Sequence, residues 1–159
     1  MVEKTNAMRI LDAHKVPYEV ITFSPDIHSA EEVAQIAGVP PSEVYKTLVV
    51  RREGGKPLLV MIAGDRTLDL KLLARAVGEK KLKMATHRQA EEWTGLQVGG
   101  ISPLALLNRG FEVYIDRPAT QLSHVYVSAG RRGINLRVPV QDLLKITGAK
   151  VIEVTTETE

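Results

Sequence analysis

The sequence contains no cysteine, and this absence removes several kinds of chemistry. A chain without thiols cannot form a disulfide framework, attack a substrate with a cysteine, or hold zinc through cysteine ligands. Four histidines occur, His14, His28, His87 and His124, but they show no i, i+4 pair and no H-E-x-x-H motif. The sequence therefore predicts no metal site and no cofactor.

The common hydrolase and nucleotide-binding motifs are also missing. There is no G-x-S-x-G elbow, no Walker A loop and no G-x-G-x-x-G fingerprint. No segment approaches the roughly 20 uninterrupted apolar residues that cross a bilayer, and the first residues lack the apolar region of a secretion signal. We expect a cytoplasmic protein with no membrane partner.

Strong basic charge is absent as well, since the net charge is only +2 in 159 residues. Proteins that coat nucleic acid are usually much more basic, so we expect no DNA partner. The length suits one domain, 1–159, because a chain of this size buries about 70% of its unfolded surface. The acidic end, 155–159, is expected to fray.

Helix and strand signals alternate along the chain. The caps and apolar spacing predict helices over 5–14, 28–39, 69–78, 86–95 and 139–148, with one further helical turn at 40–43. Apolar runs predict strands at 18–23, 46–50, 58–63, 81–85, 111–115, 124–129, 134–138 and 150–154. Hairpins and crossovers are mixed, which favours an α+β fold with a mixed sheet of about seven strands and about five helices.

Lys46 is unexpected in the strand "EVYKTLVV". Alternation places Val44, Lys46, Leu48 and Val50 on one face of this strand, and both faces look buried. An unpaired ammonium on such a face is costly, so Lys46 must reach the rim, pair with a carboxylate or enter a polar cavity. From this strand alone, a lysine at the rim is the simplest interpretation.

Two loops could contact a ligand through their backbone or charge. In "TGLQVGGISPLAL", Gly99 and Gly100 allow close backbone approach, and free N–H groups could hold a phosphate or an oxyanion. In "VYVSAGRRGINLRV", the hairpin turn carries Arg131 and Arg132, which could meet phosphates. From these residues alone, an ordinary turn is the simpler interpretation of each loop.

Read together and in order, "KTNAMRIL", "VYKTLVV", "LDLKLLARAVGEKKLKMA", "TGLQVGGISPLAL" and "YVSAGRRGINL" resemble the YbaK/EbsC family of free-standing aminoacyl-tRNA deacylases. That family is related to the editing domain of bacterial prolyl-tRNA synthetases. The resemblance implies a curved, mixed α+β sheet flanked by helices. It also implies trans-editing of a mischarged tRNA, best known for Cys-tRNA(Pro), without a cofactor. The reaction is ester hydrolysis, or formally lyase-like if the substrate thiol attacks its own ester.

The resemblance also assigns roles to residues. Catalysis would depend on Lys46 and on backbone groups of Gly99 and Gly100. The positions implied for substrate binding are Thr47, Ile101, Ser102, Pro103, Ser128, Gly130 and Asn135. Arg131 and Arg132 would contact the tRNA acceptor end. The pocket wall would include Phe23, Asp26 and His28. A transient complex with prolyl-tRNA synthetase is the further partner that the family suggests.

Asn135 departs from the family pattern, which often has an acid there. An amide accepts a hydrogen bond but does not attract an α-ammonium as a carboxylate does. Three alternatives therefore stay open: a deacylase for Cys-tRNA(Pro), a deacylase for another small amino acid as in Ala-tRNA(Pro), and a binding module that holds tRNA or a nucleotide without turnover.

Overall fold

The computed structural model describes residues 3–27 and 29–157 of the chain. In this described part the α-helices have eight residues each: α1 (Asn6–Ala13), α2 (Ala30–Ala37), α3 (Leu70–Val77), α4 (His87–Thr94) and α5 (Val140–Thr147). Three short 3-10 turns accompany them: η1 (Pro41–Glu43), η2 (Leu104–Leu106) and η3 (Arg117–Gln121). Within these residues, none of the helices combines the length and the apolar character needed to span a bilayer.

The helices begin where the sequence predicts, and side-chain oxygens satisfy the first N–H groups of α1, α2, α3 and α4. Thr5 Oγ1 accepts from the Met8 N–H, and Ser29 Oγ accepts from the Glu32 N–H. Thr86 forms a complete capping box with Gln89 at the start of α4. The predicted positions of all five α-helices are confirmed.

A five-stranded sheet forms the centre of the molecule in the order β5-β2-β3-β6-β9. Its strands are β2 (Tyr45–Arg52), β3 (Leu58–Ala63), β5 (Leu82–Met84), β6 (Glu112–Asp116) and β9 (Lys150–Ile152). The hairpin β2–β3 is antiparallel, whereas β6 runs parallel to β3 and β9 parallel to β6. The sheet is therefore mixed, as predicted.

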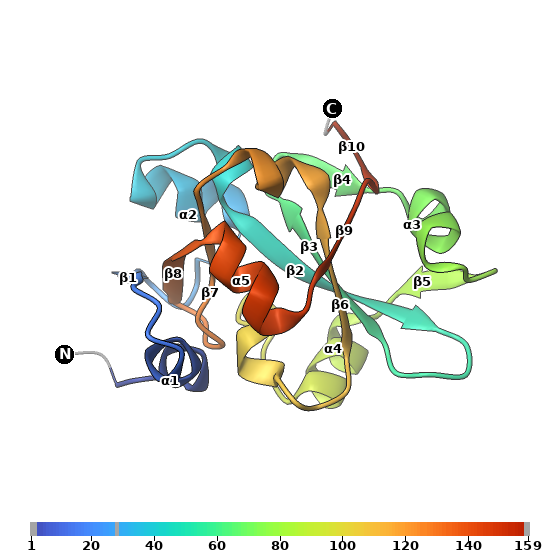
Figure 1. Ribbon diagram of the computed structural model, residues 1–159, viewed down its shortest axis with the longest axis horizontal. Coiled ribbons are helices and arrows are strands. Elements are labelled where there is room, and N and C mark those ends of the chain that lie inside the picture. Colours follow the sequence, from blue (N-terminus) through green and yellow to red (C-terminus); the bar gives the residue numbers. More distant parts are fainter. Residues whose placement is uncertain (1–2, 28, 158–159) are drawn as a thin grey trace.

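Two smaller sheets complete the described fold. The antiparallel three-stranded sheet has the order β1-β8-β7 and contains β1 (Glu19–Thr22), β7 (His124–Ser128) and β8 (Ile134–Pro139). The third sheet pairs β10 (Thr155–Glu157) with β4 (Arg66–Leu68). Figure 1 shows the three-stranded sheet and α1 on the left and α3 on the right.

The pairing of β10 corrects two expectations. The tail does not fray over Thr155–Glu157, because these residues form a ladder with β4 and Thr155 Oγ1 donates to the buried Asp116 carboxylate. Strands β4 and β10 were missed because each has only three residues and little apolar character. The described part consequently has ten strands in three sheets rather than about seven in one.

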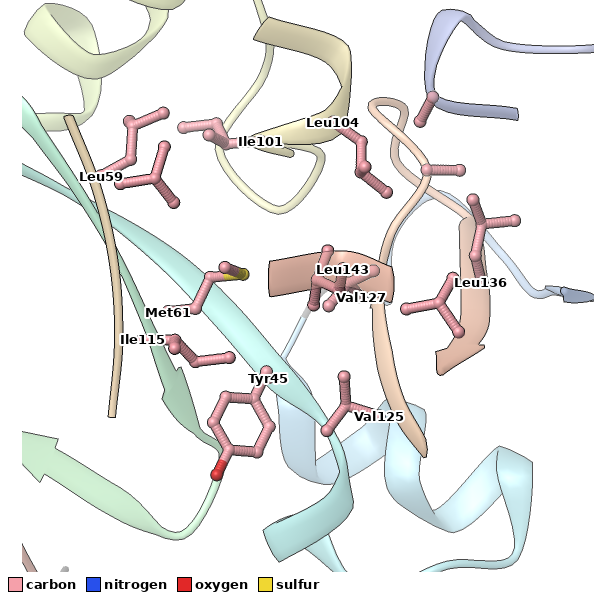
Figure 2. Close-up of a cluster of buried hydrophobic side chains, with 14 of the residues drawn as sticks. Tyr45, Leu59, Met61, Ile101, Leu104, Ile115, Val125, Val127, Leu136 and Leu143 are labelled. Carbon is pink, nitrogen blue, oxygen red and sulfur yellow. The ribbon is translucent and has the colours of Figure 1, made fainter. Parts of the chain in front are cut away.

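The main core lies between the five-stranded and three-stranded sheets, with α5 inserted between them (Figure 2). Leu59 and Met61 of β3 face Val127 of β7 and Leu143 of α5 across this core. Ile101 belongs to the same cluster, although it lies in the loop after α4. Burying these side chains contributes about 1.5–3 kcal/mol each, which fixes the loop against both sheets.

Candidate functional site

The site begins where β2 and β7 separate. Val44 and Tyr126 form an isolated parallel bridge, and within the described residues the two strands make no further pairing. Lys46 and Ser128 each follow this bridge by two residues and face the widening gap. The edge of β2 stays open until β5 pairs with it from Val50 onward.

The open edge of β2 presents backbone groups to this gap. The Gly64 N–H donates to Val44 O on the β3 side, at 2.8 Å, and the Ala85 N–H donates to Val49 O on the other side, at 3.0 Å. Backbone groups alternate between the two edges of a strand, so those of Thr47 point the same way as those of Val49. The Thr47 N–H and C=O therefore face the gap and not β3.

The loop 97–101 closes the gap on its third side. Arg132 Nε donates to Val98 O at 2.7 Å, which ties this loop to the β7–β8 turn. A β-carbon built on Gly100 would stand 2.8 Å from the Arg132 nitrogen, so only glycine allows this contact. The Gly100 N–H already donates to Gln97 O at 2.7 Å.

Gly100 therefore does not offer the free N–H that the sequence suggested, because its N–H is used inside the loop. The neighbouring N–H groups of Gly99 and Ile101 donate to no group in the described part of the chain. Gly99 has a φ of 93°, a left-handed conformation that glycine adopts without strain. Gly99 and Ile101 are thus the better candidates for backbone donors to a ligand.

A cavity of about 150 Å³ fills the space between β2, β7 and the loop. Its described lining residues are Phe23, Ala30, Val33, Val44, Tyr45, Lys46, Thr47, Leu48, Val98, Gly99, Ile101, Ser128 and Asn135. Seven of the predicted site residues thus lie around one cavity. Those seven are Phe23, Lys46, Thr47, Gly99, Ile101, Ser128 and Asn135.

Lys46 is exposed at the mouth of this cavity. Its side chain therefore lies at the rim of the sheet and also borders a polar cavity, two of the alternatives that the sequence left open. The expectation that both faces of β2 are buried is wrong here, because the sheet is uncovered at this end. The Lys46 ammonium makes no ion pair or hydrogen bond with any described residue. The described lining contains no acidic side chain, so the cavity attracts anionic groups.

Asn135 lies deeper in the wall and is only 6% exposed. It pairs with Ser128 across the β7–β8 ladder, which places both side chains on one face. Ser128 Oγ accepts from the Gly130 N–H at 3.1 Å, whereas the Asn135 amide makes no hydrogen bond within the described residues. A buried amide without a protein partner is costly unless water or a ligand satisfies it.

Tyr45 also borders the cavity but cannot act as a base. Burial, assisted by the nearby Asp116 and Asp65 carboxylates, raises the pKa of Tyr45. Its hydroxyl is therefore neutral at physiological pH.

An apolar wall faces these polar groups. It consists of Phe23, Ala30, Val33, Val44 and Val98. The sequence signal for Ala30 and Val33 was their i, i+3 spacing in α2, but nothing local indicated which cavity that helix would cover.

Other predicted residues lie outside the cavity. Ser102 and Pro103 are buried in the fold beneath it, and Asp26 is exposed and does not line it. Gly130 and Arg131 border a different cavity, and Arg132 has its Nε committed to Val98. His28 lies outside the described residues. Proximity in sequence suggested that Asp26, Ser102, Pro103, Gly130 and Arg131 line the same cavity, but the packing of their loops places them elsewhere.

The described His, Asp and Glu side chains form no group of three that could hold a metal ion. What the cavity offers is one cation, amide groups and backbone N–H groups around a small space. Such groups can position an ester and stabilise negative charge that develops on its carbonyl oxygen.

The chain belongs to the aminoacyl-tRNA editing domain family, because the model of that family matches residues 24–146. It is 39% identical over 157 residues to the Enterococcus faecalis protein named "Putative Cys-tRNA(Pro)/Cys-tRNA(Cys) deacylase EbsC", covering 98% of this chain and 95% of that protein. A Proline--tRNA ligase of Nitratidesulfovibrio vulgaris is 37% identical over 83 residues, which are 52% of this chain and 14% of the ligase. The family resemblance inferred from the motifs is thus confirmed.

Solved structures agree with this assignment. The "Crystal structure of a putative trans-editing enzyme for prolyl tRNA synthetase" matches with a TM-score of 0.82 and 27% identity, covering 98% of this chain and 99% of that one. The crystal structure of the hypothetical protein APE2540 matches with a TM-score of 0.87 and 27% identity, covering 95% and 99%. These matches confirm the predicted α+β fold class.

Proposed function

We propose that this protein is an aminoacyl-tRNA deacylase that acts in trans, removing a small mischarged amino acid from the 3′ end of a tRNA. The observation that carries this proposal is the single small cavity shared by Lys46, the Gly99 loop and Asn135. Charged tRNAs are used in the cytoplasm, where we expect the protein to act.

The size of the cavity supports a small aminoacyl group. A cavity of about 150 Å³ is comparable to an engineered protein cavity that binds benzene. A cysteinyl, alanyl or similar side chain fits against the apolar wall of Val33 and Val98, whereas a tryptophan side chain is too large. We favour Cys-tRNA(Pro) as substrate because of the Enterococcus faecalis relative, with Ala-tRNA(Pro) as the alternative.

The groups around the cavity suggest how the ester is positioned. The exposed ammonium of Lys46 would hold a phosphate of the terminal nucleotide or the ester end, as a point charge. The N–H groups of Gly99 and Ile101, which have no partner among the described residues, would stabilise the carbonyl oxygen as it gains charge, which can contribute about 3–4 kcal/mol. The Asn135 amide and the Thr47 backbone would orient the aminoacyl group.

No protein nucleophile is required for this reaction. An aminoacyl ester is already activated, and water attacking its carbonyl yields the free amino acid and the ribose hydroxyl of the tRNA. With a cysteinyl substrate, the side-chain thiol can attack the same carbonyl, and the ribose oxygen leaves with a proton. Holding the reactants together provides much of the acceleration in either case.

A panel of mischarged tRNAs tests the function and its specificity in one experiment. We expect rapid loss of the aminoacyl group from Cys-tRNA(Pro) or Ala-tRNA(Pro) and no hydrolysis of correctly charged Pro-tRNA(Pro). If every charged tRNA survives while the protein still binds tRNA, the alternative of a non-catalytic binding module holds instead.

Lys46→Ala tests the role of the cation. We expect the rate of deacylation to fall by at least about 100-fold, because positioning and charge stabilisation are lost together. The melting temperature should barely change, since Lys46 is exposed and unpaired in the described structure. The matched control is Lys83→Ala, an exposed lysine in strand β5 that does not border the cavity. A fully active Lys46→Ala protein would remove this residue from the mechanism.

A transient complex with prolyl-tRNA synthetase would bring the substrate to this small protein. The sequence match to part of a Proline--tRNA ligase supports a shared substrate. It is no evidence that this protein and the synthetase bind each other. Co-purification at low salt of the protein with its own synthetase and tRNA is the direct test, and separate elution of all three would count against a complex.

A further inference from the structure

A second cavity, of about 360 Å³, lies on the other side of the wall that closes the proposed active site. Its lining comes from four segments that are distant in sequence: 4–9 at the start of α1, 94–96 at the end of α4, 105–109 around η2, and 129–131 in the β7–β8 turn. We call this cavity the basic groove. Figure 1 shows α1, at the lower left, beside the β7–β8 turn.

The described lining of the basic groove carries four cations, Lys4, Arg9, Arg109 and Arg131, and no acidic side chain. This concentration contrasts with the net charge of only +2 for the whole chain. Lys4 is neutralised by an ion pair with Asp12, so the three arginines provide the unbalanced charge.

The contacts of these arginines leave their charge available. Arg9 Nη1 donates to Asn6 Oδ1 at 3.3 Å, and Arg109 Nη1 donates to Thr94 O at 3.0 Å. Both acceptors are neutral. Arg131 is exposed and makes no hydrogen bond or ion pair through its side chain within the described residues. Guanidinium groups stay charged at any physiological pH and match phosphate geometry through paired N–H groups.

The basic groove is adjacent to the proposed active site. Ser128 lines the first cavity, and Gly130, two residues later, lines the second. Likewise, Val98 lines the first cavity, and Leu96, two residues earlier, lines the second. Two residues of extended chain span about 7 Å, so one thin wall separates the two cavities. The second cavity is therefore within reach of a nucleic acid strand whose end occupies the first.

We propose that the basic groove binds the phosphodiester backbone of the RNA strand whose 3′ end enters the active site. This inference rests on the proposed function, because it takes the occupant of the first cavity to be a tRNA end. The groove provides charge and neutral hydrogen-bonding side chains, such as Thr5 and Asn6, which suit phosphate and ribose and carry no base-specific code. It thereby supplies affinity for the acceptor strand without sequence preference.

The test measures binding of an uncharged RNA hairpin with an unpaired 3′ end, by fluorescence anisotropy at several salt concentrations. The variant is Arg9→Gln/Arg131→Gln, because both arginines are exposed and have little structural role. The control is Lys71→Gln/Arg75→Gln, which removes the same charge from the exposed face of α3. We expect the groove variant to bind at least about tenfold more weakly, with a salt slope smaller by about 1.4, for two phosphates on a single strand.

Each other outcome overturns the inference. Wild-type affinity and salt slope in the groove variant would exclude the groove from RNA binding. An equal loss in the control would mean that total charge matters and not the groove. A groove variant that loses affinity for an acidic polypeptide but not for the RNA hairpin would assign the groove to a protein partner.

Deacylation assays separate this inference from the proposed function. If the protein deacylates tRNA, the groove variant should lose more activity on full tRNA than on an aminoacyl ester of the terminal adenosine, because only the full strand reaches the groove. If no charged tRNA is deacylated, the proposed function fails. The binding experiment still decides the role of the groove.

Discussion

Gly100 lies against the backbone of Arg132 so closely that a β-carbon on Gly100 would come within 2.8 Å of the Arg132 nitrogen. This contact joins the loop after α4 to the β7–β8 turn, and the two together form the wall between the active-site cavity and the basic groove. The geometry of both cavities therefore depends on one glycine that lines neither.

Gly100→Ala should lower the free energy of unfolding by about 1–3 kcal/mol, because two backbone segments must move to admit a methyl group. Deacylation should fall as well, since the displaced loop carries Gly99 and Ile101. Gly55→Ala is the matched control, because the three atoms nearest to its β-carbon all belong to the Arg52 side chain, the closest at 2.9 Å, and not to backbone. Equal losses of stability in chemical denaturation of the two variants would contradict the proposed importance of the shared wall.

Asn135→Asp should raise kcat/KM for an aminoacyl-tRNA, by up to about tenfold, because a carboxylate attracts the α-ammonium of the substrate more strongly than an amide does. The activity of the variant should fall at acidic pH as the new carboxylate is protonated. Asn135→Ala is the comparison and should lose activity. If the aspartate variant is slower than the wild type at every pH, Asn135 acts as an amide donor to the substrate.

Ser102→Ala should stabilise the protein by about 1 kcal/mol. The Ser102 hydroxyl is fully buried and has no hydrogen-bond partner among the described residues, and such a group costs about 1–3 kcal/mol. The same substitution at Ser29 should destabilise the protein by about 1 kcal/mol, because it removes the N-cap of α2. Thermal unfolding of the two variants should therefore move in opposite directions, and a destabilised Ser102→Ala would indicate an unseen partner for this hydroxyl.

Stability should decrease above pH 10 because of Tyr114. Burial and a 2.8 Å hydrogen bond to Glu112 raise the pKa of Tyr114 to about 12 from its ordinary value of 10.0. Because the pKa of Tyr114 is higher in the folded state, the unfolded chain loses the phenol proton at a lower pH than the folded protein does. The stabilisation provided by the protonated Tyr114 hydroxyl is therefore complete below pH 10 and is lost by pH 12. Tyr114→Phe should reduce the loss of stability across this interval by about 1–2 kcal/mol. Urea unfolding at pH 9 to 12 measures the free energy of unfolding of both proteins. An equally steep decrease of this free energy in Tyr114→Phe would show that Tyr114 is not responsible for it.

Local patterns in the sequence were sufficient for the helices and for the family. The caps at Thr5, Ser29 and Thr86 act within four residues of each helix start, so no distant contact is needed to predict them. The deacylase was suggested by the resemblance of the lysine strand, the glycine loop and the arginine turn to a known family, and not by their spacing alone. The short strands β4 and β10 could not be predicted, because they depend on pairing with each other and on the contact of Thr155 with Asp116, all between segments far apart in sequence.

The sequence by itself determined where the helices begin, that Lys46 stands out in an apolar strand, and which family the motifs resemble. Only the tertiary structure decided which neighbours of those motifs share a cavity. The separation of β2 from β7 after Val44 and Tyr126 turned Lys46 and Asn135 toward one space, while the packing of the loop against Arg132 buried Ser102 and placed Arg131 on the opposite side. These relations depend on contacts between segments about 30 to 90 residues apart, which the spacing of residues along a chain does not encode.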